Sequence, residues 1–127
     1  MTAGTDRADH EAASLPAGKL AAWLKEHLGR QVTAYAVGLS DPGLLGRYAA
    51  GMCVPSDQEL DRMCCAYQAA RRLTDAYGDT TASSWFFGTS PSLADRAPAA
   101  VLREAAGPAE MDSVVQAARA FVANDFS

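Results

Sequence analysis

The segment from Gln31 to Gly51 constrains the fold of this chain more strongly than any other part of it. It is typical of two short helices joined by a tight turn, because Gly38 can take the positive φ that such a turn needs. Asp41 is a good N-cap for the second helix, and Pro42 suits that helix's first position. We therefore predict a helix-turn-helix, in which residues 41–50 form the element that faces a DNA major groove.

The second helix of this pair offers few side chains that could read DNA. Arg47 is the natural partner of a base or a phosphate, and Arg30 could add a phosphate contact. Two glycines, Gly43 and Gly46, weaken this helix by about 1 kcal/mol each. The candidate DNA contacts are Ser40, Asp41, Gly43, Leu44, Arg47 and Arg30.

The charge of the chain is unevenly distributed. Its formal net charge is −4, which is unusual for a protein that binds DNA through electrostatics alone. Between residues 18 and 77 there are nevertheless seven basic and six acidic residues, whereas residues 80–127 include three and five. The first half is therefore the better candidate for contact with nucleic acid.

Metal, cofactor and catalytic sites have little support in the sequence. Cys64 and Cys65 are adjacent, so they point about 100° apart on a helix and cannot line one site. The two histidines, His10 and His27, lie far apart without ligand spacing, so we expect no zinc site. No phosphate loop, dinucleotide fingerprint or Ser/His/Asp arrangement is present, so we expect no cofactor and no enzyme activity.

A membrane or secreted location has no support either. No apolar run reaches 18 residues, and no signal peptide precedes the first predicted helix. We therefore expect a cytoplasmic protein without membrane contact, whose thiols are reduced and pack as small apolar groups.

The rest of the sequence predicts further helices. The strongest prediction is a helix over 57–77, because Ser56-x-x-Glu59 forms a capping box and Gly78 ends the periodic pattern. Thr80 or Thr81 could cap a short helix over 82–88. Other helical patterns cover residues 16–28, 98–106 and 109–123.

No strand pattern competes with these helices, so the predicted fold class is all-α. Residues 1–17 are polar and alanine-rich, which indicates a flexible N-terminal arm. A helix-turn-helix bundle is expected over 18–78, followed by a small C-terminal helical domain over 80–127.

Three consecutive aromatic residues, Trp85, Phe86 and Phe87, cannot all point the same way on a helix. We expect at least one ring to be exposed, and exposed aromatic rings often mark a surface that binds a partner. The alternative is that each ring packs against a different helix of a small core.

Several short motifs occur in an order that is similar to a known family. The first half contains Val-Thr-Ala-Tyr, Gly-Leu-Ser-Asp-Pro and Gly-Arg-Tyr-Ala-x-Gly within residues 32–51. The second half contains Ser-Trp-Phe-Phe-Gly from Ser84, Ser-Pro-x-Leu from Ser90, Arg-x-Pro from Arg96, and a last apolar helix. Over about residues 18–124 the chain resembles the Xre/MbcA/ParS antitoxin family, of the actinobacterial type.

The sequence departs from this family at three places. Ala94-Asp95 stands where the family often has Gly-Gly, which puts the role of that loop in doubt. Tyr48 replaces the usual tryptophan. Gly43 and Leu44 stand where polar residues are usual, which puts specific contact with DNA in doubt.

The resemblance implies an antitoxin of a type II toxin–antitoxin pair. Its partner would be a RES-domain toxin that consumes NAD, bound by the C-terminal half. The helix-turn-helix would bind the promoter of its own operon or mediate dimerisation. The candidate partner contacts are Trp85, Phe86, Phe87, Ser90, Leu93 and Arg96.

We also expect a homodimer, because an isolated helix-turn-helix reads only half of a DNA site. Its seam would involve residues 85–87 or 109–123. Two other functions stay open: a stand-alone helix-turn-helix transcriptional regulator, and a protein-interaction module whose helix-turn-helix is vestigial.

Overall fold

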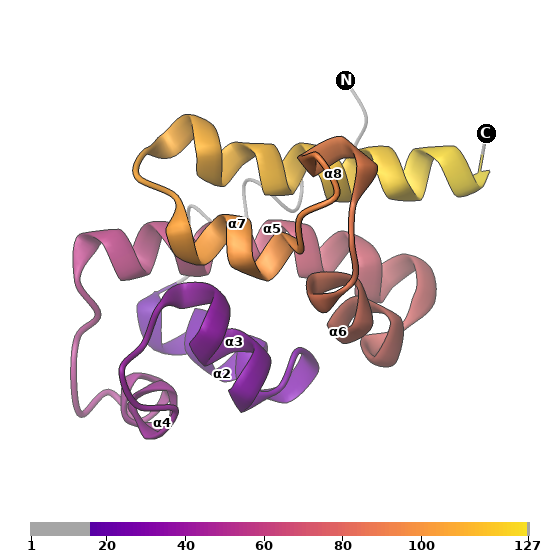
Figure 1. The fold of residues 1–127 in the computed structure, drawn as a ribbon. Helices are drawn as coiled ribbons and strands as arrows, with labels where there is room; N and C mark the ends of the chain where they lie inside the picture. Colours follow the sequence, from indigo (N-terminus) through magenta and orange to yellow (C-terminus); the bar gives the residue numbers. More distant parts are fainter. Residues whose placement is uncertain (1–15, 127) are drawn as a thin grey trace.

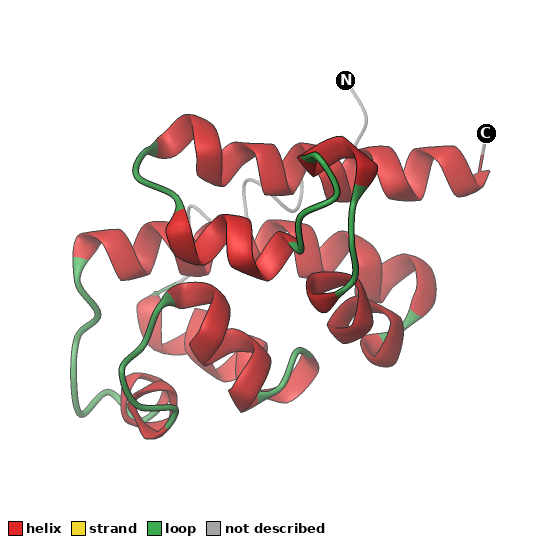
Figure 2. Ribbon diagram, in the orientation of Figure 1, coloured by secondary structure: helices red, strands yellow, loops and turns green. Residues whose placement is uncertain are grey.

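The computed structural model describes residues 16–126, with side chains as far as Asn124. Within this range the chain is all-α, as predicted, and Figure 2 shows helices joined by loops without a strand. Most of the predicted N-terminal arm, residues 1–17, lies outside the described residues. The elements are α2 (Ala17–His27), α3 (Arg30–Val37), α4 (Gly43–Ala49), α5 (Asp57–Tyr77), α6 (Asp79–Phe87), the 3-10 turn η1 (Pro91–Leu93), α7 (Pro98–Glu104) and α8 (Pro108–Phe126).

The long helix α5 begins where its capping box predicts and ends, as predicted, before Gly78. The Glu59 backbone N–H donates to Ser56 Oγ (3.1 Å), and the Ser56 N–H donates to Glu59 Oε1 (2.9 Å). This reciprocal pair satisfies two backbone donors that the first turn of a helix leaves unpaired. α8 runs beside α5 (Figure 1), so the two longest helices form the frame on which the shorter helices pack.

The start of α6 differs from the prediction over 82–88. Gly78 has a φ of 99°, and this conformation lets the chain turn directly from α5 into α6 at Asp79. Thr80 and Thr81 therefore lie inside the first turn of α6 and do not cap it. The other helices agree with their predicted ranges to within three residues at each end.

One apolar core joins the segments on both sides of Gly78. Leu24 and Val37 from the first half and Phe86, Leu102 and Val114 from the second are all buried in the same cluster. The helices over 80–126 thus cover faces of α3 and α5 that would otherwise be exposed. The predicted boundary between residues 78 and 80 is a turn between two helices of this common core.

Candidate nucleic-acid and partner interfaces

The turn that precedes α4 has the left-handed glycine that the sequence predicts, but Pro42 and not Asp41 is the N-cap of α4. Gly38 adopts a left-handed conformation (φ 83°), and Leu39 behind it is buried. Asp41 Oδ1 accepts a hydrogen bond from the Gly43 N–H (3.0 Å). α4 begins at Gly43, one residue after the predicted first position, although Pro42 already has helical dihedral angles. In Figure 1 α4 is seen nearly along its axis, whereas α3 crosses the view.

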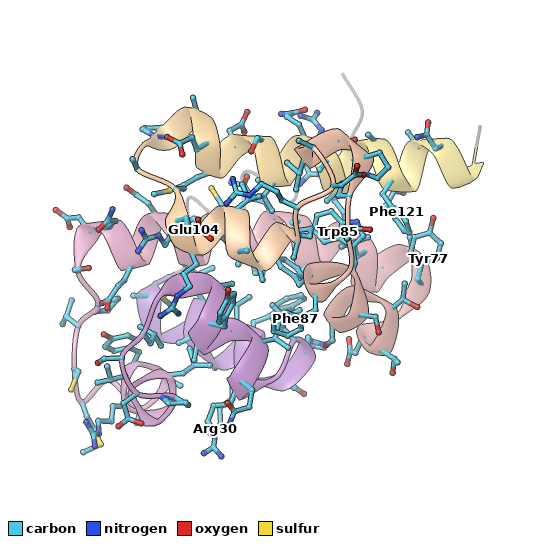
Figure 3. The ribbon with its side chains drawn as sticks, in the orientation of Figure 1. Arg30, Tyr77, Trp85, Phe87, Glu104 and Phe121 are labelled. Carbon is cyan, nitrogen blue, oxygen red and sulfur yellow. The ribbon has the colours of Figure 1, made fainter. Side chains whose placement is uncertain are left out.

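The candidate DNA contacts differ in their exposure. The side chains of Ser40, Asp41, Arg47 and Arg30 are exposed. Gly43 is half-buried, and Leu44 is half-buried against the core, so the contacts of Leu44 are mainly internal. In Figure 3 Arg30 projects from the lower edge of the molecule, the edge at which α4 also lies.

α2 adds a cation that the sequence of α4 could not reveal. Lys25 is exposed, and its Nζ lies 3.8 Å from the place that a Cβ on Gly46 would occupy. Lys25 therefore lies over the middle of α4, on the side where Gly46 leaves room. Lys25 of α2 therefore joins Arg47 of α4 as a basic group at this helix.

Glu59 fixes the end of α4 against the start of α5. Its Oε1, which already accepts from the Ser56 backbone, also accepts a hydrogen bond from the Tyr48 hydroxyl (2.9 Å). Burial, reinforced by this bond and by the Glu59 charge, raises the pKa of Tyr48 to about 12. The phenol is therefore neutral at ordinary pH and acts as a donor.

Arg62 on α5 connects the end of α3 with the C-terminal half. Its guanidinium donates to the carbonyl oxygen of Val37 at the end of α3 (3.3 Å) and to that of Ala105 after α7 (3.2 Å). A Cβ on Gly38 would lie 3.2 Å from the same guanidinium. The positive charge of Arg62 stabilises the C-terminal ends of α3 and α7, because the unpaired carbonyl groups there carry partial negative charge.

The predicted partner contacts in α6 and the following loop are mostly buried. Trp85, Phe86, Ser90 and Leu93 are all inside, with Phe86 completely enclosed. Ser90 and Arg96 close the loop through a backbone hydrogen bond (3.2 Å). The side chains of these four residues fill the core beneath the surface and offer little area to a partner, so their role as partner contacts stays a prediction.

Phe87 and Arg96 are the two candidates that reach the surface. Phe87 is 52% exposed and lies between α3 and α6 in Figure 3, so the prediction of one exposed ring is confirmed. Arg96 is exposed and forms an ion pair with Glu104 on α7 (3.1 Å).

The structure groups Phe87 with two residues that sequence reasoning missed. The Tyr35 ring lies 5.8 Å from the Phe87 ring between centroids, and the Arg103 guanidinium stacks 4.8 Å from the centre of the Tyr35 ring. Arg103 also donates to the Tyr35 carbonyl oxygen (3.0 Å). We call Tyr35, Phe87 and Arg103 the aromatic–arginine surface. The run of three aromatic residues led to Phe87 as a candidate contact, but no local sequence pattern singles out Tyr35 or Arg103.

A second aromatic group lies where the end of α5, the last turn of α6 and α8 meet. The Phe121 ring on α8 is 5.7 Å from the Tyr77 ring and 6.5 Å from the Trp85 ring, and Figure 3 shows the three together. Phe121 is 43% exposed.

A shallow hollow of about 360 Å³ lies between α5 and the start of α8. Its lining includes Asp61, Cys64 and Asp112. Burial, and then the charge of Asp61, raise the pKa of the Cys64 thiol, so this thiol is a poor nucleophile at neutral pH. The described residues contain no group of three or more metal-binding side chains. None of the described helices is long and apolar enough to cross a bilayer.

Comparison of the chain with family models, curated proteins and solved structures found no match. The resemblance to the antitoxin family therefore stays a prediction from the motifs.

Proposed function

We propose that this chain is the antitoxin of a type II toxin–antitoxin pair, with a RES-domain, NAD-consuming toxin as its partner. The motif order in the sequence supports the family, and the fold is compatible with it. The observation that supports the proposal most is the aromatic–arginine surface, which combines an exposed Phe87 with a stacked Arg103 on a rigid helical frame. Such residues carry much of the binding energy at protein interfaces.

The proposed antitoxin neutralises its partner by binding, not by chemistry. Cofactors play no part in this proposal. The helix-turn-helix would bind the promoter of the operon through Arg47, with Arg30 and Lys25 near phosphates. A homodimer would supply the second half-site, and the cytoplasm is the compartment in which such a toxin acts.

The proposal is tested by co-expression with the RES-domain protein encoded beside this chain's gene. We expect the toxin alone to stop growth and deplete NAD, and co-expression of the chain to restore both. Growth arrest that persists despite a soluble, folded chain would contradict the proposal. The absence of any RES-domain reading frame beside the gene would also count against it.

A second candidate function is a protein-interaction module whose helix-turn-helix no longer binds DNA. One observation favours it: the start of α4 offers few groups that could bind DNA. Gly43 has no side chain, Leu44 is half-buried, and the Asp41 carboxylate before the helix accepts a hydrogen bond from the Gly43 N–H. Neutralisation of the toxin without any shift of promoter DNA would favour this candidate. A stand-alone regulator would instead bind its promoter and lack a toxin.

A further inference from the structure

We propose that the aromatic–arginine surface is the site at which the toxin docks, and that the toxin presents there an apolar side chain beside a carboxylate. This inference rests on the proposed function, which supplies the partner. It places part of the docking site on α3, within the helix-turn-helix half, because Tyr35 belongs to that helix. The interface therefore extends beyond the C-terminal half that the resemblance implies.

The surface is preorganised for binding. Tyr35 is 40% exposed and Phe87 52%, so both rings offer apolar area to a partner. The Arg103 guanidinium is held over the Tyr35 ring and hydrogen-bonded to the Tyr35 backbone. Three helices of one core fix these residues, so docking orders few side chains and loses little conformational entropy.

The charges around this surface indicate the chemistry of the partner. Arg103 forms no ion pair with a described carboxylate, whereas Glu104 next to it is paired with Arg96. The acidic residue of α6, Asp79, is hydrogen-bonded to His27 at the far end of that helix. The surface thus combines apolar rings with one positive charge that has no acidic partner there. A carboxylate beside an apolar side chain complements it.

The test uses the full-length chain and the RES-domain protein encoded beside its gene. Affinity is measured by calorimetry for the wild type and for Phe87→Ala, Arg103→Ala and Arg103→Glu. Val54→Ala is the control, because Val54 is also an exposed apolar side chain but lies between α4 and α5, outside the aromatic–arginine surface and the expected dimer seam. Melting temperatures are recorded for every variant, so that loss of folding is separated from loss of binding.

We expect Phe87→Ala and Arg103→Ala to weaken binding at least tenfold, and Arg103→Glu to weaken it further through repulsion. Val54→Ala should bind like the wild type, and all four variants should melt within a few degrees of it. Wild-type binding that all three surface variants retain would overturn the docking site and leave the proposed function standing. A wild-type chain that does not bind the toxin would overturn both.

Two other outcomes would also overturn the inference. If the surface variants lose self-association in sedimentation experiments but keep toxin affinity, the surface joins two copies of the chain. If Arg103→Glu weakens only the binding of promoter DNA, the surface belongs to a nucleic-acid interface.

Discussion

At the scale of single residues, Glu59 does more than cap a helix. The same carboxylate oxygen accepts from the Ser56 N–H and from the Tyr48 hydroxyl, so the start of α5 and the end of α4 share one acceptor. Tyr48 is 5% exposed, and its ring is part of the core. A buried hydroxyl without such a partner would destabilise the fold. The pair therefore fixes α4, the helix with the candidate DNA contacts.

We predict that Tyr48 makes folding stability sensitive to alkaline pH. Its pKa rises from 10.0 to about 12 in the folded chain, so the fold favours the neutral phenol. This stabilisation is fully present below pH 10 and is lost as the pH rises through 12. Tyr48→Phe should cost about 0.5–1.5 kcal/mol at pH 7 through the lost hydrogen bond.

Urea unfolding between pH 7 and pH 11.5 measures this effect. The difference in unfolding free energy between wild type and Tyr48→Phe should shrink above pH 10, because only the wild type has this group to ionise. A difference that stays constant over the whole range would show that the phenol of Tyr48 is not protected by the fold.

At the scale of elements, α4 is held mainly by α2. A Cβ on Gly18 of α2 would lie 3.2 Å from the Tyr48 carbonyl oxygen, so a glycine there permits the close approach of the two helices. Further along, Lys25 lies above Gly46. The surface that a DNA duplex would meet is therefore made by both helices, with Arg47 as the exposed cation of α4 itself.

We predict that Arg47→Ala weakens binding to the chain's own promoter. The loss should be about 1–3 kcal/mol if Arg47 reads a base. If Arg47 contacts a phosphate instead, the slope of log affinity against log salt concentration should become shallower by about one. Arg96→Ala is the control, because Arg96 is also an exposed arginine but lies between η1 and α7, where it is paired with Glu104. Equal promoter affinity of the two variants would exclude α4 as the reading helix.

At the scale of the whole molecule, the two predicted domains are packed as one unit. α8 lies along α5, α7 packs on α3, and their buried side chains join a single core. Arg62 adds polar contacts between the same parts, from α5 to the ends of α3 and α7. Removal of either half would expose large apolar areas to water, and each Å² of exposed apolar area would cost about 25 cal/mol of folding free energy.

We predict that a chain ending at Gly78 fails to fold cooperatively. It lacks Phe86, Leu102 and Val114, which fill the core over α3 and α5. Thermal unfolding followed by circular dichroism should show one sharp transition for the full chain and a broad, shallow change for the fragment. A sharp, reversible transition of the fragment would instead establish the helix-turn-helix as an independent domain.

The features that the sequence by itself determined are local. The capping box at Ser56 and Glu59, the left-handed Gly38 and the stop at Gly78 depend on neighbours within a few residues, so their types alone predict them. The sequence predicted the start of α6 at residue 82 instead of Asp79, because Gly78 both ends α5 and serves as the N-cap of α6. The all-α class follows from the same local periodicity.

The tertiary structure alone decided which of these residues meet. Phe86 and Phe87 are neighbours in the chain, but one is enclosed by the core and the other is half-exposed. Tyr35 and Arg103 are 68 residues apart, and only the packing of α7 on α3 brings the guanidinium onto the ring. Exposure and long-range contact depend on how the helices pack, and periodicity gives only the face that each helix turns inward.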